Sequence, residues 1–475
     1  MFDHDTYLSP LTWRYGSEEM RRIWSETHKR RLMRRVWVAL ARAQSPAGLV
    51  SPAQVAELEA HVDDVDIVRA QEIERETRHD VMAEIRAFAE QCPAAGGIIH
   101  LGATSADITD NADVLRQREA LDLLLARLRA LLGVLVDRIE ETADLPAMAH
   151  THIQPAEPTT LGYRFAVYAQ DLLDDYEALL QIRERLRGKG LKGAVGTQAA
   201  FADLLAGSSV TPEQMEAAAM AQLRLPYFPI ATQTYSRQQD LRVLQHLAGI
   251  GASLHKFALD FRVLQSPPFG EWAEPFGKGQ VGSSAMPFKR NPINAENICS
   301  LARYVAALPG IAWDNASQAV LERSLDDSAN RRLFMAEGFL ILDELLRRST
   351  RLVAEMTIVE AALARNMDTY GPFAATERVM MAAAAAGADR QQAHEWLRDA
   401  SLVAWGALRD GASGNPLVEL LAADGRLTAF VPPDKIRRLM DVDAHIGTAP
   451  ARARALAAAV RVHLADAAAT DSAAV

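Results

Sequence analysis

Apolar residues recur at three- and four-residue spacing along most of the chain, which is the period of a helix with one buried face. Alternating strand patterns are scarce. The spacing predicts helices near 18–44, 111–142, 160–187, 236–265, 292–308, 328–365 and 373–387. We therefore expect an all-α protein with a long helical bundle. The wide apolar faces fit a bundle completed by other subunits and equally a monomeric bundle, because periodicity does not separate the two.

Turn-rich breaks divide this helical pattern. Pro93 to Gly102 precedes the long helix expected from Asn111, and Asn366 to Pro372 precedes shorter, alanine-rich helices. We expect domain boundaries near 111 and 365. The resulting three domains are an N-terminal helical domain over 1–111, a central long-helix bundle over 112–365 and a small helical C-terminal domain over 366–475.

Composition and charge exclude several classes of protein. The net charge of −10 over 475 residues argues against a general nucleic-acid binder, although local basic clusters could still bind a small anion. Cys92 and Cys299 cannot build a disulfide framework, and no Cys/His spacing predicts a zinc site. Neither a targeting segment nor an apolar run of membrane-spanning length is evident. We expect a cytoplasmic protein without a membrane segment or bound metal.

The segment 282–292, GSSAMPFKRNP, joins two serines to two cations and a predicted helix start. Glycines at and before its start would let it close over a ligand. Asn291 and Pro292 are typical of an N-cap and a first helical residue. Lys289 and Arg290 would then lie beside a positive helix end that could hold a carboxylate. A serine in that field would deprotonate more easily, as a general base requires. A flexible connector with a solvated basic tip explains these residues equally well.

The stretch 150–160, HTHIQPAEPTT, runs through two prolines into a predicted helix. Its histidines, His150 and His152, therefore lie on a restrained connection rather than inside a regular element. A fixed imidazole there could donate a proton. Taken alone, the two histidines are better explained as side chains that satisfy backbone groups around a turn.

Two shorter stretches carry polar side chains that could contact a ligand. Arg78-His79-Asp80-Val81-Met82 places a histidine between opposite charges, which alone fits a solvated helix surface. Gly102-Ala103-Thr104-Ser105-Ala106-Asp107 places small hydroxyl residues after a glycine, which suits carboxylate binding. A turn that caps the following helix would give the same sequence.

The stretch 321–332, LERSLDDSANRR, predicts a cationic helix start. If a helix begins near Asp327, Ser328 and Arg332 share one face. Arg323 would approach from the preceding loop. This arrangement suits a phosphate, and a capped helix with an exposed ion-pair face is the alternative.

Together the motifs resemble those of the adenylosuccinate lyases in the fumarase/aspartase superfamily. GSSAMPFKRNP is similar to the signature loop of the superfamily, and the RHDV, GATS, TH-x-QPAEPTT and ER-x-LDDSANRR patterns are similar to those of adenylosuccinate lyases. The matches run in the expected order from Tyr7 to beyond Arg390. Two departures are Trp13, where small residues are usual, and Phe288, which replaces a Tyr or His and cannot donate a hydrogen bond.

The resemblance assigns roles to individual residues. It implies that Ser283 is the general base, with Ser284 as the alternative, and that His152 is the general acid. Lys289 would stabilise the carbanion and Glu296 would orient the acid. The residues implied to bind substrate are Arg14, Tyr15, Arg78, His79, Asp80, Thr104, Ser105, Thr151, Gln198, Ser284, Met286, Asn291, Arg323, Ser328 and Arg332.

The implied reaction is the β-elimination of fumarate from adenylosuccinate, giving AMP, and from the succinylocarboxamide ribotide SAICAR, giving AICAR, in purine nucleotide biosynthesis. No metal, nicotinamide or pyridoxal cofactor is implied. The implied fold is a three-domain, all-α fold whose central bundle is completed in a homotetramer with shared active sites.

Three alternatives remain. Another lyase of the superfamily, acting on argininosuccinate, aspartate or malate, would have no use for the phosphate set Arg323, Ser328 and Arg332. A relative acting on a modified purine succinyl-nucleotide would keep every motif. A non-enzymatic helical scaffold would be expected to lose catalytic groups such as Ser283 and His152, which are both present.

Overall fold

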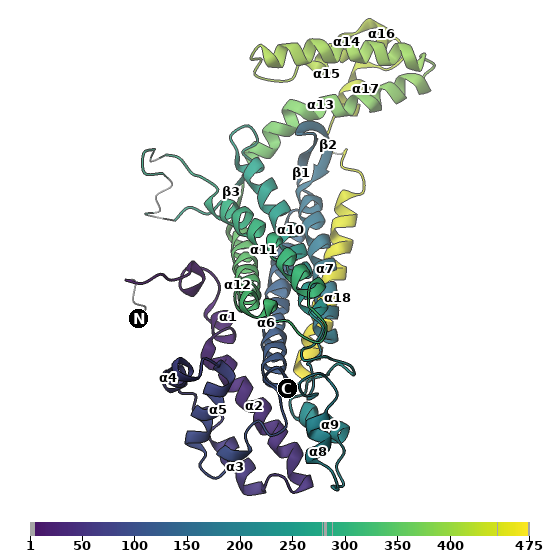
Figure 1. Cartoon of the computed structure of the whole chain (residues 1–475). Coiled ribbons are helices and arrows are strands. Elements are labelled where there is room, and N and C mark those ends of the chain that lie inside the picture. Colours follow the sequence, from purple (N-terminus) through teal and green to yellow (C-terminus); the bar gives the residue numbers. More distant parts are fainter. Residues whose placement is uncertain (1–4, 278, 280–282, 287, 444, 474–475) are drawn as a thin grey trace. The chain divides into compact units, whose positions relative to one another are not determined.

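The computed structural model describes residues 5–277, 279, 283–286, 288–443 and 445–473 (Figure 1). Helices dominate these residues, which confirms the predicted all-α class. The strands within the described part of the chain form two small antiparallel sheets, one of β1 (Pro146–Thr151) and β2 (Gln154–Thr160) and one of β3 (Trp272–Ala273) and β4 (Thr357–Ile358).

Contacts between residues divide the chain into two compact units. The first unit comprises Met1–Leu128, Asp175–Ala252 and Ser300–Leu346. The second comprises Arg129–Asp174, Ser253–Cys299 and Arg347–Val475. The boundaries expected near 111 and 365 stay a prediction.

Six of the short helices in the first unit follow a residue whose side chain accepts a hydrogen bond from the first turn, whereas the one that begins at Ala199 has no such cap. Ser51 and Thr211 each form a capping box with a glutamine three residues later. The short helices are α1 (Glu18–Ile23), α2 (Glu26–Gln44), α3 (Pro52–Ala60), α4 (Ile67–Thr77), α5 (Asp80–Gln91), α8 (Ala199–Leu204) and α9 (Pro212–Gln222), with single 3-10 turns η1 (Pro10–Thr12), η2 (Ser45–Ala47) and η3 (Gly96–Ile98). The one helix expected over 18–44 is therefore two, because Ser25 caps a new helix after Trp24.

Five long helices contribute residues to both units, namely α6 (Ser105–Glu141), α7 (Leu161–Arg185), α10 (Gln238–Gln265), α11 (Ile293–Ser317) and α12 (Asp326–Glu355). Helix α6 begins at Ser105, so the hydroxyl loop leads directly into it. Helix α11 continues through Pro309 to Ser317, beyond the end expected at 308. Helix α12 stops at Glu355, ten residues before the expected end at 365.

The hairpin of β1 (Pro146–Thr151) and β2 (Gln154–Thr160) was not predicted. It places His150 inside a strand rather than on an irregular connection, so that expectation was wrong. Thr151 pairs with Gln154, which leaves His152 and Ile153 as a two-residue turn. Both turn residues have positive φ, 55° and 60°, as a twisted hairpin of this length favours.

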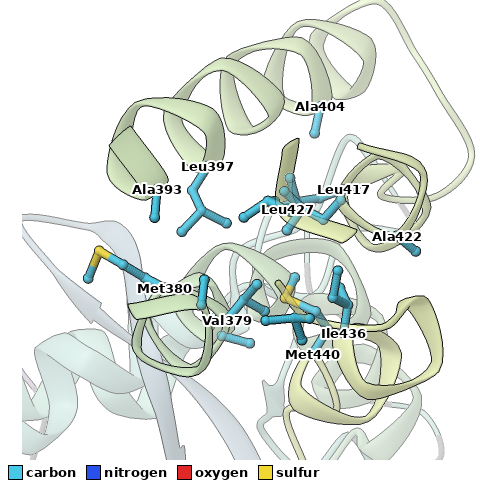
Figure 2. Packing of buried hydrophobic residues seen from close by; sticks show 14 of the residues in the cluster. Val379, Met380, Ala393, Leu397, Ala404, Leu417, Ala422, Leu427, Ile436 and Met440 are labelled. Atoms are coloured by element: carbon cyan, nitrogen blue, oxygen red, sulfur yellow. The ribbon is translucent and has the colours of Figure 1, made fainter. Parts of the chain in front are cut away.

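The second unit contains a separate apolar cluster formed by its C-terminal helices (Figure 2). These helices are α13 (Glu360–Ala385), α14 (Arg390–Arg409), α15 (Leu417–Ala423), α16 (Gly425–Thr428) and α17 (Pro433–Leu439), and the chain ends in α18 (Ala449–Ala473). Val379, Leu397 and Ile436 are buried in this cluster. The turn predicted over Asn366–Pro372 is wrong, because these residues lie inside α13.

Each unit buries one of the two cysteines, and neither cysteine is in a disulfide. Cys92 follows α5 in the first unit and is fully buried. Burial raises the pKa of its thiol to about 11, and the nearby Glu57 adds to this effect. Cys299 lies in α11 and is 1 % exposed.

Candidate active site

The first unit contains a cavity of about 570 Å³ lined by charged side chains. Its walls come from five parts of the sequence: the start of α2, the α4–α5 junction, the start of α6, the residues before α10 and the start of α12. Eight of the residues predicted to bind substrate line it, namely Arg78, His79, Asp80, Thr104, Ser105, Arg323, Ser328 and Arg332. The structure therefore brings together three motifs that are far apart in the sequence.

The junction of α4 and α5 presents a cation and an imidazole to this cavity. Arg78 ends α4 in the left-handed conformation, and its side chain has no ion pair or hydrogen bond within the described residues. His79 caps α5, and its Nδ1 accepts from the Met82 N–H at 3.3 Å. Asp80 accepts from Arg332 at 2.7 Å. Burial alone would raise the pKa of Asp80, but the Arg332 charge outweighs burial and holds that pKa below its usual range.

The Thr104–Ser105 loop is held from both ends. Before it, Gly102 has a φ of 79°, and a Cβ there would lie 2.7 Å from Leu204 Cδ1, so only glycine fits without a shift. After it, the carboxylate of Asp107 accepts from the Thr104 N–H at 3.0 Å. The cap at the start of α6 is thus formed by the Asp107 carboxylate, and Thr104 and Ser105 line the cavity.

His100, in the turn before this loop, was not singled out from the sequence. Its Nδ1 accepts from the Trp37 indole N–H at 3.0 Å, which leaves the other ring nitrogen protonated in the neutral form. Burial lowers the pKa of His100 to about 4, with Asp107 opposing the shift and His79 adding to it. His100 is therefore neutral at physiological pH.

The start of α12 carries the predicted phosphate set. Arg237 donates to Asp327 at 2.6 Å, and Arg323 lies 3.1 Å from the same carboxylate. Asp327 thereby fixes Arg323 against the helix start. Burial acts to raise the pKa of Asp327, but Arg237 and then Arg323 outweigh burial and lower it. Ser328 and Arg332 follow one turn apart on the cavity wall, as the four-residue spacing predicted.

A buried ionic network lies under this set. Arg331 donates to Asp240 at 2.7 Å, to Asp113 at 3.2 Å and to the Tyr235 hydroxyl at 2.8 Å. Arg237 forms a bidentate pair with Asp110, both bonds at 3.1 Å. This network was not predicted from the sequence. Its signal was the series of aspartates three residues apart, at 107, 110 and 113, in a helix that is otherwise largely apolar on its buried side.

Three predicted binding residues of the first unit do not line the cavity. Arg14 and Tyr15 follow η1, and the Arg14 guanidinium lies 5.8 Å from the Tyr15 ring centre. Gln198 has a φ of 55° just before α8, and its Nε2 donates to the Leu191 carbonyl at 2.9 Å and to Glu216 at 3.1 Å.

The predicted general acid belongs to the second unit. His152 and Thr151 are exposed at the end of the β1–β2 hairpin. Ile153 beside them is 67 % exposed although it is β-branched and has positive φ, a combination that costs backbone energy without any compensating burial in this chain. The turn therefore presents His152 to solvent in one fixed backbone conformation.

The predicted general base also belongs to the second unit. Ser283 Oγ accepts from the Met286 N–H at 3.1 Å and from the Ala285 N–H at 3.4 Å. Donors aimed at that oxygen favour a negative charge on it. Ser284, Met286 and Lys289 are exposed. The residues Gly282 and Pro287 of this motif lie outside the described residues.

The start of α11 differs from the prediction. The helix begins at Ile293 rather than at Pro292, and its first amides already have an anionic partner. Glu274 accepts from the Ala295 N–H at 2.8 Å and from the Asn294 N–H at 3.1 Å. A substrate carboxylate therefore does not find these two amides free, so the expected contribution of the helix amides to an anion site is wrong, while the contribution expected from Lys289 and Arg290 stays a prediction. Glu296 is exposed in the first turn of α11, which Asn291 precedes.

No hydrogen bond or ion pair among the described residues joins His152 to Ser283. No group of three or more metal-ligating side chains occurs in that part of the chain. None of its helices has the length and hydropathy needed to cross a membrane.

Known proteins resemble this chain over nearly its whole length. A family model described as "Lyase" matches residues 12–307, and one described as "Adenylosuccinate lyase C-terminus" matches residues 372–456. The adenylosuccinate lyase of Schizosaccharomyces pombe is 38% identical over 458 residues, which cover 95% of this chain and 94% of the relative. That of Archaeoglobus fulgidus is 36% identical over 447 residues, which cover 94% of this chain and 97% of the relative.

Solved structures share the fold. The 3-carboxy-cis,cis-muconate lactonizing enzyme from Pseudomonas putida superposes with a TM-score of 0.83 at 27% identity, over 95% of this chain and 100% of that one. The fumarate lyase from Mesorhizobium sp. BNC1 gives a TM-score of 0.82 at 23% identity, over 95% and 99% of the two chains. With the motifs, the all-helical fold and these relatives in agreement, the chain belongs to the lyase family and, within it, to the adenylosuccinate lyases.

Proposed function

We propose that this protein releases fumarate from adenylosuccinate, giving AMP, and from SAICAR, giving AICAR, without a cofactor. The observation that carries the proposal is the cavity of the first unit. It combines three guanidinium groups, of Arg78, Arg323 and Arg332, with the hydroxyl of Ser328. Such a set suits a phosphate dianion. A lyase acting on aspartate or argininosuccinate would have no use for it.

The proposed chemistry begins at Ser283. Its alkoxide takes a proton from the succinyl carbon beside a carboxylate, and the electron pair left behind spreads into that carboxylate. The two backbone N–H groups that already point at Ser283 Oγ support this role, because they stabilise the alkoxide. No side-chain hydrogen bond of Ser284 favours that residue in the same way within the described residues.

The carbanion then collapses. Its electron pair forms the carbon–carbon double bond of fumarate, and the carbon–nitrogen bond to the nucleotide breaks. His152 gives its proton to the departing nitrogen, with Glu296 orienting the imidazole. Lys289, Asn291 and the Thr104–Ser105 loop stabilise the charge that develops on the carboxylate.

We further propose that the protein is a homotetramer whose active sites are built from several copies of the chain. Exposed apolar side chains on the long helices support an assembly, since monomeric proteins rarely leave large apolar patches in contact with water. Ile311 and Trp313 of α11 are 39% and 56% exposed, and Leu333 of α12 is 63% exposed. Sedimentation would test this, and a monomer with full activity would contradict it.

The shared site has a sharper test. Ser283→Ala and His152→Ala homotetramers are each expected to be inactive. If a site takes its acid and its base from different copies, mixed tetramers made from the two variants regain part of the activity. Mixtures that stay inactive after subunit exchange would contradict the sharing of acid and base.

A substrate panel tests the function itself. Fumarate release is measured with adenylosuccinate, SAICAR, aspartate and argininosuccinate. Release from both succinyl nucleotides is expected. Silence with both nucleotides, together with fumarate from another compound, would overturn the proposal.

We also propose a cytoplasmic location, which the two cysteines outside disulfides support.

A further inference from the structure

Asp107 is a buried carboxylate behind the Thr104–Ser105 loop that the proposed chemistry does not use. It is 0% exposed, so it cannot touch a substrate. Its Oδ2 accepts from the Thr104 N–H at 3.0 Å and from the Gly193 N–H at 3.1 Å. Its Oδ1 accepts from Lys189 Nζ at 2.6 Å and from the Lys192 N–H at 2.9 Å. One carboxylate thus joins the loop to a second segment.

That second segment, the strap of residues 188–198, carries Gln198 at its end. The Gln198 backbone N–H donates to the Lys192 carbonyl, and its side-chain Nε2 donates to the Leu191 carbonyl, both at 2.9 Å. Glu216 holds the same stretch from the other side, because it accepts from Lys192 Nζ at 2.6 Å and from Gln198 Nε2 at 3.1 Å. Both N–H bonds of the Gln198 amide are thereby directed into the fold, and its oxygen is the atom left for a ligand.

Close packing restricts the backbone conformation of the strap at Gly190. A Cβ on Gly190, whose φ is 84°, would lie 2.0 Å from Glu216 Oε1. Asn111 brackets the same glycine, donating to its carbonyl at 2.9 Å and accepting from its N–H at 3.2 Å. Leu191 packs into an apolar cluster with Phe201 and Met215. The strap is therefore a fixed body, and Asp107 is the group that fastens the Thr104 backbone to it.

We propose that Asp107 is a positioning residue that sets the distance between the Thr104–Ser105 loop and Gln198. The inference rests on the proposed function, which gives both segments to one substrate. A buried ion pair such as Asp107–Lys189 contributes little net stability, because removing both charges from water costs about as much as their attraction returns. Its value lies in geometry. Four donors bind this one carboxylate, and together they fix the position of the loop relative to the strap.

Two variants break the ion pair from opposite sides. Asp107→Asn removes the charge and replaces one carboxylate oxygen with an NH2 group. In one orientation this NH2 faces the N–H groups of Thr104 and Gly193, and in the other it faces Lys189 Nζ and the Lys192 N–H, so donor meets donor in both. Lys189→Met removes the cation but leaves Asp107 its three backbone donors. Both are expected to lower the urea midpoint of unfolding. Only Asp107→Asn is expected to lower kcat/KM, by about 10- to 100-fold, because misplaced binding groups cost that much.

Amide hydrogen exchange in the substrate-free protein gives a readout that does not depend on turnover. We expect faster exchange in the peptide over 102–107 for Asp107→Asn and wild-type exchange there for Lys189→Met. If the native protein releases no fumarate from either succinyl nucleotide, the proposed function fails, and the exchange comparison still decides whether Asp107 fixes the loop. Equal acceleration in both variants would overturn the inference.

The double variant Asp107→Asn with Lys189→Met separates geometry from stability. It carries no uncompensated buried charge, so it is expected to recover part of the stability that Asp107→Asn loses, and it replaces that variant should the single change fail to fold. We expect kcat/KM to stay low in the double variant. Recovery of kcat/KM together with stability would show that Asp107 acts through stability alone and would overturn its positioning role.

Discussion

The cavity of the first unit and the two reactive segments of the second are built on opposite principles. The cavity rests on buried, mutually paired charges, with Arg331 and Arg237 each held by carboxylates inside the fold. His152 is exposed, and so are Ser284, Ala285 and Met286, which follow Ser283. The binding half of the proposed site is thus formed by the single chain. The proposed acid, His152, and the proposed base, Ser283, are not enclosed by the described residues of this chain.

The largest expected effect follows from replacing the base. Ser283→Ala should lower fumarate release by about 100- to 10,000-fold, the contribution of a general base, while the unfolding transition stays near that of the unchanged protein. Steady-state assays with thermal unfolding check both parts. Ser284→Ala is the matched control and should retain most activity. The reverse pattern would assign the role of base to Ser284. Strong destabilisation by Ser283→Ala would show that this segment, like the cavity of the first unit, depends on contacts within the chain.

The next largest effect is on the stability of the first unit. Arg331→Met leaves Asp240 without its buried cation and leaves Asp113 with Arg116 alone, and it should cost about 3–5 kcal/mol of unfolding free energy. Urea denaturation measures this. The control is Arg351→Ala, which removes an exposed arginine paired with Glu355 and should cost no more than about 0.5 kcal/mol. Similar losses of unfolding free energy in both variants would mean that the buried ionic network stabilises the first unit no more than an exposed ion pair does.

Substrate binding should respond to the exposed cation of the cavity. Arg332→Ala removes a guanidinium proposed to bind phosphate and should raise KM by about 10- to 100-fold, the range for a hydrogen bond to a charged group, with a smaller change in kcat. Initial-rate kinetics separate the two parameters. Arg332→Lys keeps the charge without the planar fork and should fall between. A drop in kcat at constant KM would place Arg332 in the chemical step instead.

Acid should weaken the first unit through His100. The folded state holds the pKa of His100 near 4, below its usual value of about 6.5, so only the unfolded chain binds that proton between these pH values. The stabilisation is full above about pH 6.5 and is lost as pH falls toward 4, by up to about 1.4 kcal/mol per pH unit.

His100→Asn keeps a residue that tolerates positive φ and removes the titrating group. Urea titrations at several pH values should therefore show a shallower loss of stability in the variant. An unchanged pH slope would assign the acid sensitivity to other groups.

The smallest effect concerns the hairpin turn. Ile153→Gly should stabilise the protein by about 1 kcal/mol, because glycine adopts positive φ without the penalty that a β-branched residue carries there. Thermal unfolding measures the change. Ile153→Asn also tolerates this conformation and should give part of the gain. Destabilisation by both changes would show that the exposed isoleucine makes contacts in the assembled protein.

Local pattern predicted the helices and the polar motifs well, because period and capping residues act over short distances. The hydroxyl loop before α6 and the four-residue spacing of Ser328 and Arg332 are examples. Prolines misled the prediction twice. Pro309 and Pro372 lie inside α11 and α13, where packing outweighs the lost hydrogen bond.

Long-range pairing could not be predicted from one sequence. Nothing local indicated that Glu274 would take the first amides of α11, since the two are about twenty residues apart with a loop between them. The same holds for the bonds of Asp107 to Lys189 and Lys192, which lie more than eighty residues further along the chain. Contacts of this kind depend on the completed fold, and here they decide which anion sites stay open.

The two cysteines offer a use of their own as reporters. Cys92 is enclosed in the first unit and Cys299 in the second, and each is shielded from solvent in the folded chain. A thiol reagent reaches either sulfur only when its surroundings open, so the labelling rate of each measures the opening of one unit. Mass spectrometry of the labelled peptides would time the two events separately in the unmodified protein.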